Sequence, residues 1–355
     1  MLDYNKFLEE LIISVAESNA SDLHLVVGRN PIIRVSGNLI SLSKKPILSP
    51  EDTSRLVEVL LGKDEYERFI QNKERDFSYS FKDKLRFRVN AYFQKGFIGA
   101  ALRLIPLHVS TLEELSLPKS LLEFTKKEQG FFLVVGPTGH GKSTTLASLI
   151  DSINHSRTEH IITVEDPIEY LFTPDRSIID QREVGADTKD FATALRSIFR
   201  EDVNVVMTGE MRDHETMATA VTAAETGHLV FSSLHTNNAA QTVDRIIDSF
   251  PGSQQSQIRA QLANTLLGVF SQRLIPRVSG GLVLAYELLI ANTAVRNLIR
   301  ENKAHEIDLV IETSADFGMV SFNRSLADLV GRGEIILENA LAYSLNPREL
   351  KSLIG

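Results

Sequence analysis

The sequence of 355 residues contains no cysteine, so it can form neither disulfides nor thiolate-bound zinc or iron–sulfur centres. A cysteine-free chain of this kind is typical of a reducing compartment. No apolar run approaches the roughly 18 residues that span a bilayer. The N-terminal segment also lacks the basic start and apolar run of a signal peptide. We therefore expect a cytosolic globular protein.

Basic clusters are also scarce. The formal net charge is −8, and lysine and arginine never occur in a run longer than a pair. A nucleic-acid motor needs a local basic stripe, so this composition argues against nucleic acid as a partner. The 43% hydrophobic and 24% charged residues are typical of an ordinary globular protein, and the length predicts two or three domains.

The first 106 residues predict a small mixed α/β domain. Apolar residues recur on one face of a helix over residues 4–18. Two later segments, 77–81 and 85–93, alternate apolar and polar residues like half-buried strands. Prolines near both ends of residues 107–118 indicate a linker to the next domain.

Beyond the linker the pattern changes to apolar segments separated by helical ones. Strands are expected at 131–135, 160–164, 203–207, 229–233 and 282–290. Strands that alternate with helices predict a parallel sheet with crossover helices. We expect this α/β domain over residues 119–292 and a helical subdomain over residues 293–355.

One short segment matches the phosphate-binding pattern G-x-x-x-x-G-K-[ST], between an apolar strand and a helix. Its glycines let backbone N–H groups turn toward phosphates, and the following helix adds its positive end. Lys142 is expected to reach the β- and γ-phosphates, and Ser143 to ligate Mg²⁺. The predicted nucleotide site consists of Gly136, Pro137, Thr138, Gly139, His140, Gly141, Lys142, Ser143 and Thr144.

Two acids follow buried strands downstream of this loop. Glu210 follows the segment 203–207, where an acid can hold Mg²⁺ or orient the attacking water. Glu165 ends the segment 160–164 and is the second candidate for handling water. The alternative is a solvated carboxylate at a strand end or, for Asp166, a loop cap.

Histidines and arginines supply further candidates. His228 and His235 are seven residues apart, so on a regular strand they point to opposite faces and cannot share one metal. His235 lies at the carboxyl end, where ligands collect in open α/β sheets, and can sense a γ-phosphate or be structural. Arg88 shares a strand face with Arg86, and Arg103 lies on a later strand; these form a solvated face or reach a phosphate across a subunit boundary.

In combination these motifs resemble the ATPases of type II secretion and type IV pili. The family's boxes correspond, in order, to the P-loop, Thr163–Glu169 (Asp box), Gly209–Asp213 (Walker B box) and Gly227–Thr236 (His box). The octad Ala294–Glu301 resembles a segment characteristic of the twitching-motility retraction ATPases, the PilT group. Ser21–Leu25 and Asp244–Pro251 fit the same group.

The resemblance implies a PAS-like N-terminal domain, a RecA-like P-loop ATPase domain and a C-terminal helical subdomain, assembled as a homohexamer. It implies an ATP hydrolase that requires Mg²⁺ and powers pilus retraction. Such a motor acts at the cytoplasmic face of the inner membrane through a pilus platform protein. The catalytic residues it implies are Glu210, Glu165, His235, His228, Arg88 and Arg103, with Ser143 and Glu210 as metal ligands.

Two departures and two alternatives accompany the resemblance. His140 stands where the family usually has a small residue, and Lys95 stands near a turn where relatives usually have an arginine.

The first alternative function is pilus assembly or secretion. The missing cysteines exclude the four-cysteine zinc site of assembly motors, and we expect no additional N-terminal domain. The second alternative function is a nucleotide-dependent switch with little turnover. Glu165 and Glu210 argue against it, because a switch does not need two acids that handle water.

The helical spacing of the octad predicts two faces. The apolar members are expected to pack on the ATPase core: Val295, Leu298 and Ile299. The polar members are expected to be exposed and to couple hydrolysis to retraction: Arg296, Asn297 and Arg300.

Overall fold

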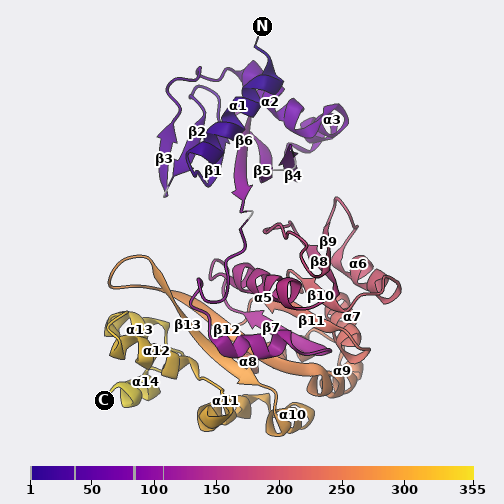
Figure 1. The fold of residues 1–355 in the computed structure, drawn as a ribbon, viewed down its shortest axis with the longest axis vertical. Helices are drawn as coiled ribbons and strands as arrows, with labels where there is room; N and C mark the ends of the chain where they lie inside the picture. The colour runs from indigo at the N-terminus through magenta and orange to yellow at the C-terminus, as the bar shows by residue number, and fades with distance from the viewer. Residues whose placement is uncertain (1, 36, 83–84, 107) are drawn as a thin grey trace. The chain divides into compact units, whose positions relative to one another are not determined.

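The fold is taken from a computed structural model that describes every residue except 1, 36, 83–84 and 107. The chain forms two compact units, Met1–Leu107 and His108–Gly355. Each unit has hydrophobic cores of its own (Figure 1).

The N-terminal unit is an antiparallel sheet with helices packed on one face. The strands lie in the order β3-β2-β1-β6-β5-β4. Their bounds are β1 Asp22–Leu25, β2 Ile32–Val35, β3 Asn38–Ser41, β4 Glu74–Phe81, β5 Leu85–Gln94 and β6 Phe97–Ile105. The helices are α1 Tyr4–Glu17, α2 Pro50–Leu61 and α3 Lys63–Asn72. Because strand side chains alternate, only one face, which includes Leu23 and Phe87, joins the helices in the core.

The second unit is built on a mostly parallel sheet in the order β13-β12-β7-β11-β10-β8-β9. Its strands are β7 Gly130–Val135, β8 His160–Glu165, β9 Ile178–Glu183, β10 Val205–Thr208, β11 Leu229–Leu234, β12 Leu266–Pro276 and β13 Leu282–Ile290. Every pairing is parallel except that of β12 with β13. The carboxyl ends of β7, β8, β10 and β11 therefore lie at one edge.

Helices cover both faces of this sheet, as expected for βαβ crossovers (Figure 1). Their bounds are α4 Leu122–Thr125, α5 Lys142–Ser156, α6 Phe191–Ser197, α7 His214–Glu225, α8 Ala239–Asp248 and α9 Gly252–Thr265. Short 3₁₀ turns lie at η1 Lys119–Leu121 and η2 Ile198–Arg200. Leu112 and Leu117 are buried against this unit, so much of the expected linker packs on it.

The C-terminal segment is helical, as predicted. It contains α10 Thr293–Arg300, α11 Ile307–Thr313, α12 Phe322–Gly331, α13 Leu337–Tyr343 and α14 Pro347–Ile354, with 3₁₀ turns η3 Ala304–Glu306 and η4 Ala315–Phe317. An isolated bridge between Val320 and Leu288 attaches it to β13. Three of these helices, α12, α13 and α14, surround a separate small core with the β12–β13 hairpin.

The octad shows one departure from its predicted faces. Val295 and Ile299 are buried, as predicted, and Leu298 is partly buried. The expectation that Arg296 is exposed is wrong, because its guanidinium donates hydrogen bonds to four backbone carbonyls. Three of these carbonyls, at Ala263, Asn264 and Leu266, lie where α9 ends and β12 begins. Arg296 therefore caps the end of α9.

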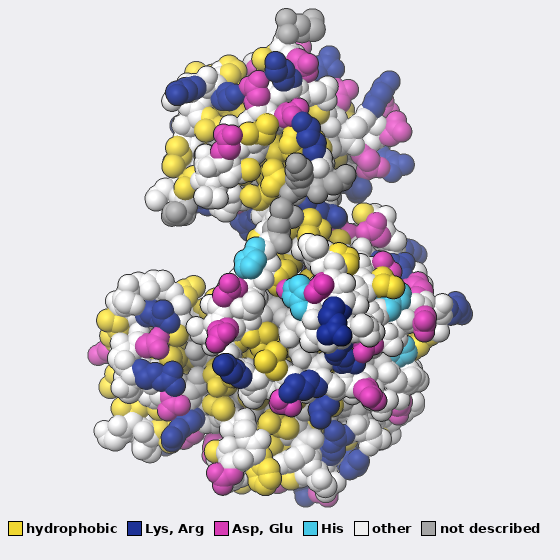
Figure 2. All heavy atoms as spheres, viewed as in Figure 1, with side chains coloured by type: hydrophobic (Ala, Val, Ile, Leu, Met, Phe, Trp, Pro, Cys, Tyr) yellow, Lys and Arg dark blue, Asp and Glu magenta, His cyan; other side chains and the backbone are white. Residues whose placement is uncertain are grey.

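No helix in the described part of the chain is long and apolar enough to cross a membrane. Basic and acidic side chains are interspersed on the face of the molecule shown in Figure 2. That face carries no continuous basic stripe among the described residues, in agreement with the charge pattern of the sequence.

Candidate functional site

Four loops meet at the carboxyl edge of the parallel sheet. The phosphate-binding segment follows β7, Glu165 ends β8, Glu210 lies just after β10, and His235 just after β11. Because these strands are parallel and lie side by side, their ends bring the four features together. The structure thus joins in one place the P-loop and three residues predicted from separate motifs.

The P-loop is held in shape by the neighbouring strand β12. Gly136 has a φ of +149°, and a Cβ there would lie 2.4 Å from the carbonyl oxygen of Gln272. Only glycine fits so close an approach. The buried Gln272 side chain also donates to the carbonyl of His140 (2.6 Å) and accepts from the hydroxyl of Thr145 (2.8 Å). Through these two hydrogen bonds Gln272 ties both the P-loop and the start of α5 to β12.

His140 adds a second attachment to the same strand. Its Nδ1 accepts a hydrogen bond from the backbone N–H of Leu274 at 2.9 Å. The acceptor atom must be unprotonated, so the neutral ring carries its proton on Nε2. Burial, together with the charges of Arg273 and Lys142, lowers the pKa of His140 and favours this neutral form.

Lys142 lies buried within the loop. Its ammonium donates to the carbonyls of Gly136 (2.9 Å) and Pro137 (3.0 Å). Burial lowers its pKa, and the nearby acid Glu210 opposes that change. Two hydroxyl side chains, those of Ser143 and Thr144, follow Lys142 in the chain. The hydroxyl of Thr144 is hydrogen-bonded to the hydroxyl of Tyr170 at 2.8 Å.

A line of interacting polar side chains runs from Lys142 through His235 and Glu210 to Arg212. His235 Nδ1 lies 3.3 Å from Lys142 Nζ, and its Nε2 lies 3.1 Å from a carboxylate oxygen of Glu210. An ammonium cannot accept, so Nδ1 accepts and Nε2 donates to Glu210. Arg212 donates to the other oxygen of Glu210 and lies 3.7 Å from Asp166. Burial raises the pKa of Glu210, but the hydrogen bonds from Arg212 and His235 outweigh it, so the pKa is lowered.

Glu165 has the opposite environment, although it lies at the same edge. It is buried, and its carboxylate accepts from the hydroxyl of Thr163 (2.7 Å), the backbone N–H of Glu169 (3.3 Å) and the amide of Gln181 (3.4 Å). Burial outweighs these hydrogen bonds and raises the pKa of Glu165 to about 7. The site therefore pairs one ionised carboxylate with one that titrates near neutrality.

Three other predicted residues do not belong to this edge of the sheet. One lies elsewhere in the same unit, and two lie in the N-terminal unit. His228 precedes β11, at the opposite edge of the sheet from the P-loop, where its ring hydrogen-bonds the carbonyl of Ala223 at 3.0 Å. Its contacts are those of a structural residue. Arg88 and Arg103 lie on β5 and β6 of the N-terminal unit.

Several residues of the site were not predicted. Gln272 and Gln181 lie on β12 and β9, two strands that the sequence analysis did not identify. Their signal was weak, because a neutral amide in a strand has many structural uses. Tyr170 directly follows the Asp box, but its hydrogen bond with Thr144 depends on how the loop after β8 folds back over α5.

Comparisons with known proteins concern the family and the fold of the chain. The family model "Type II/IV secretion system protein" matches residues 3–281. The chain is 42% identical to the type IV pilus retraction ATPase PilT of Pseudomonas aeruginosa, over 94% of this chain and 96% of that protein. It is 44% identical to a twitching motility protein of Neisseria gonorrhoeae, over 90% and 86%.

Among solved structures, a crystal structure of the pilus retraction motor PilT with bound ADP superposes with a TM-score of 0.90 at 47% identity. This match covers 97% of this chain and 98% of that one. Both units and the carboxyl edge of the sheet lie within the compared region.

Proposed function

Because the chain belongs to the PilT group of type II/IV secretion ATPases and is an ATP-hydrolysing enzyme, we propose that it is a homohexameric motor that retracts type IV pili. The observation that supports this most directly is the hydrogen-bonded line from Lys142 through His235 to Glu210. It connects the P-loop to the Walker B box and the His box, two of the family's three downstream motifs, at a single edge of the sheet. A motor requires such a connection between phosphate binding and the rest of the chain.

The P-loop and the start of α5 supply most of the groups that nucleotide binding requires. The backbone N–H groups of residues 138–144 and the N-terminus of α5 would face the phosphates, and Lys142 would supply the cation. Ser143 and Glu210 would hold Mg²⁺, since a hydroxyl and a carboxylate oxygen are ligands that this ion prefers. The engagement of Thr144 with Tyr170 makes Ser143 the hydroxyl for that role. Bound Mg²⁺ would neutralise charge on the β- and γ-phosphates.

Water activation belongs to the two acids. The sequence ranks Glu210 first, but its carboxylate is engaged by Arg212 and His235, and its lowered pKa makes it a weak base. Glu165 has a pKa raised to about 7, close to the value that suits proton transfer at neutral pH. We assign the proton-accepting role to Glu165 and the orienting role to Glu210.

His235 would report the state of the γ-phosphate. It contacts both Lys142, which reaches that phosphate, and Glu210, which orients water. A phosphate that draws Lys142 away removes one of two donors to His235 Nδ1, and leaves the hydroxyl of Thr138, also at 3.3 Å. The weakened contact would let the imidazole shift, and the loop between β11 and α8 would move with it.

In this proposal each nucleotide site is completed by a neighbouring subunit of the hexamer. Arg88 and Arg103 lie in the N-terminal unit, apart from the P-loop in sequence, and would reach the phosphates of a neighbouring copy. The motor would work at the cytoplasmic face of the inner membrane through a pilus platform protein, and it would not bind nucleic acid. Retraction is favoured over assembly or secretion because two relatives matched over 96% and 86% of their length are a pilus retraction ATPase and a twitching motility protein.

Phosphate release and particle mass test the biochemical part. The purified chain is expected to form hexamers by native mass spectrometry and to release phosphate from ATP only when Mg²⁺ is present. Lys142→Ala is expected to abolish nucleotide binding while leaving the chain folded. A chain that stays monomeric with ATP and Mg²⁺, or that turns over without Mg²⁺, would contradict the proposal.

A further inference from the structure

A row of charged residues crosses the open face of the N-terminal sheet. Asp22 on β1 lies directly opposite Arg34 on β2 and Arg103 on β6. Arg103 lies in turn directly opposite Arg88 on β5. Residues paired in this way point to the same face of a sheet. Their strand neighbours, such as Leu23, point to the other face and join the core under the helices.

Asp22 is the buried centre of this row. Its side chain is 9% exposed, whereas that of Arg103 is 69% exposed. One carboxylate oxygen accepts from Arg103 Nε at 2.8 Å, and the other accepts from the hydroxyl of Ser21 at 2.7 Å. Burial raises the pKa of Asp22, but the hydrogen bonds from Ser21 and Arg103 outweigh it and lower the pKa. Asp22 is thus an ionised, fixed anchor beneath an exposed arginine.

The contact leaves the outer end of Arg103 available. Asp22 engages only Nε, the atom nearest the aliphatic stem. Within the described residues neither Nη atom of Arg103 has a hydrogen-bond partner, and Arg88 has none at all. Because a guanidinium is planar, fixing Nε also fixes the plane in which both Nη atoms donate.

The pairing of Arg88 with Arg103 is itself unfavourable. Like charges directly opposite each other destabilise a sheet. Asp22 forms ion pairs with Arg103 (2.8 Å) and Arg34 (3.7 Å), but its single negative charge offsets only one of the three positive charges in the row. An anion held above Arg88 and Arg103 would stabilise this arrangement. Two parallel N–H donors and a second cation nearby suit a phosphate group.

We propose that Asp22 is a positioning residue for ATP hydrolysis, which holds the Arg103 guanidinium so that its two Nη atoms meet the triphosphate bound by a neighbouring copy. The inference rests on the proposed function, in which Arg103 acts across the subunit boundary. Asp22 itself touches no substrate. Arg34 lies on the far side of Asp22, with its Nε 3.7 Å from the other carboxylate oxygen, and donates through Nη1 to the carbonyl of Gly37. It takes no part in the proposed phosphate contact.

The test compares three variants by steady-state phosphate release. Asp22→Asn keeps the shape of the side chain but removes its charge, and should lower kcat about tenfold through misalignment of Arg103, with little change in KM for ATP. Arg103→Gln should lower kcat at least as much, and the double variant should be no worse than Arg103→Gln alone. Arg34→Gln, the matched control from the other side of Asp22, should stay within about twofold of the wild type.

A mixing experiment separates positioning from folding. Asp22→Asn subunits keep an intact P-loop, and Lys142→Ala subunits keep an intact Asp22–Arg103 face. Mixed rings should therefore recover activity that neither variant shows alone, which a fold defect in the N-terminal unit would not allow. Asp22→Glu, which keeps the charge but moves it outward, provides a second variant if Asp22→Asn does not fold, and should recover part of kcat.

The outcomes distinguish the two proposals. Full kcat in Asp22→Asn together with a loss in Arg103→Gln would overturn the positioning role and leave the motor proposal intact. Full kcat in Arg103→Gln would overturn the action of Arg103 across the boundary. Additive losses in the double variant, or no recovery in mixed rings, would show that Asp22 acts on the fold and not through Arg103.

Discussion

At the scale of single residues, the site separates two similar carboxyls by their surroundings. Glu210 is engaged by Arg212 and His235, which stabilise its ionised form. Glu165 accepts three hydrogen bonds but is so buried that its pKa still rises to about 7. Two carboxyls whose pKa values are shifted in opposite directions can take different roles at the same pH.

Glu165→Gln should keep ATP binding and lower kcat about a hundredfold, because a positioned base is lost. In the wild type kcat should rise as pH increases through about 7, since Glu165 accepts a proton only after it ionises. Nucleotide binding and a pH profile of phosphate release measure both effects. Glu128→Gln, at an exposed acid just before β7, is the control and should keep the wild-type profile. Full turnover in Glu165→Gln would assign the base to Glu210.

His228 and His235 show what sequence position alone leaves open. Both flank the same strand, and the family resemblance implies a site role for both. The strand β11 places its two ends at opposite edges of the sheet, so only His235 reaches the P-loop. A histidine at the amino end of a parallel strand instead finds local partners, such as the carbonyl of Ala223.

At the scale of elements, the P-loop depends on a strand that follows it by more than a hundred residues. Gln272 and the backbone of Leu274, both on β12, hold the loop through His140. The small residue usual at position 140 in the family cannot make the second of these contacts. The imidazole therefore adds a hydrogen bond to β12 that a small side chain at position 140 would not provide.

His140→Ser should raise KM for ATP about threefold to tenfold at neutral pH, since a buried hydrogen bond of about 1 kcal/mol is lost. In the wild type the same bond should weaken as pH falls, because protonation removes the acceptor at Nδ1. The lowered pKa places this loss below the usual value of 6.5. His140→Asn keeps an acceptor near Nδ1, so it should retain a near wild-type KM without the acid dependence. Identical acid dependence in His140→Asn would refute the assignment.

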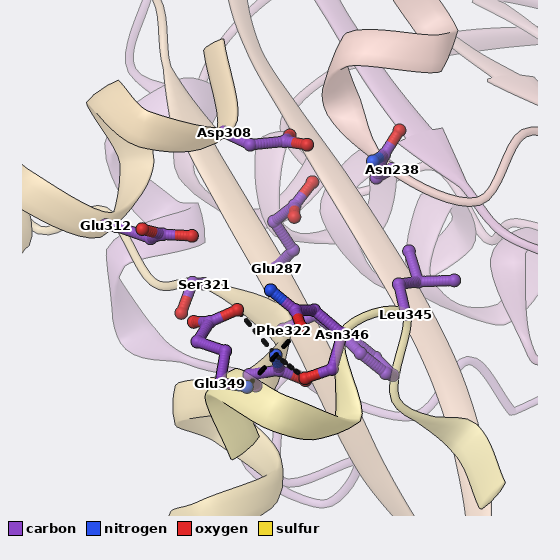
Figure 3. Close-up of a pocket in the computed structure, with 10 residues that line it drawn as sticks. Asn238, Glu287, Asp308, Glu312, Ser321, Phe322, Leu345, Asn346 and Glu349 are labelled. Atoms are coloured by element: carbon purple, nitrogen blue, oxygen red, sulfur yellow. Dashed lines mark hydrogen bonds between the residues drawn. The ribbon is translucent and has the colours of Figure 1, made fainter. Parts of the chain in front are cut away.

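A second element-scale feature is a cavity of about 250 Å³ between the β12–β13 region and the C-terminal helices (Figure 3). Four carboxyl groups line it, those of Glu287, Asp308, Glu312 and Glu349. Glu287, from β13, points into the cavity and accepts from the backbone N–H of Ala239 at 2.8 Å. Burial, with a contribution from Asp308, raises the pKa of Glu287 to about 8, although Ala239 and Arg273 oppose the rise.

This raised pKa predicts that the second unit loses stability as pH rises. The folded state retains the proton of Glu287 up to about pH 8, whereas an unfolded glutamate releases it near 4.5. The stabilisation is therefore complete below 4.5 and is lost as pH rises through about 8. Glu287→Gln keeps the acceptor for Ala239 without the titration, so its melting temperature relative to the wild type should increase from pH 6 to pH 9. Glu338→Gln, at an exposed site on α13, should show a constant difference.

At the scale of the whole molecule, the sequence predicted the class of fold, the order of its parts and the centre of the site. These follow from local signals, such as the P-loop between a strand and a helix. The strands β9 and β12 were not predicted. β9 is partly polar, and β12 follows α9 directly, with no turn residue between Thr265 and Leu266. Contacts made by these strands, such as those of Gln272, arise only when the sheet assembles.

The capping role of Arg296 was missed for a related reason. Its position on the polar side of the octad predicts exposure, and helical spacing carries no information on the neighbouring element. The end of α9 supplies carbonyls that attract the guanidinium. The polar members of the octad therefore differ, since Asn297 and Arg300 are exposed and Arg296 is half-buried.

The last prediction concerns the direction of the motor. With no cysteine in the chain, the four-cysteine zinc site of assembly motors cannot form. Residues 277–281, between β12 and β13, form a tight turn with no inserted module, closed by a hydrogen bond from the backbone N–H of Arg277 to the carbonyl of Gly281 at 3.1 Å. The octad and the matched retraction proteins favour the same direction.

Deleting the gene should therefore leave cells with more surface pili and no twitching, because filaments would still be built but not withdrawn. Electron microscopy of pili and a surface-motility assay measure the two effects. Restoring the wild-type gene should return both to normal, whereas a Lys142→Ala allele should restore neither, because retraction requires nucleotide binding. Cells without pili after the deletion would show that the motor builds the filament. Unchanged pili and motility would show that the chain serves another machine.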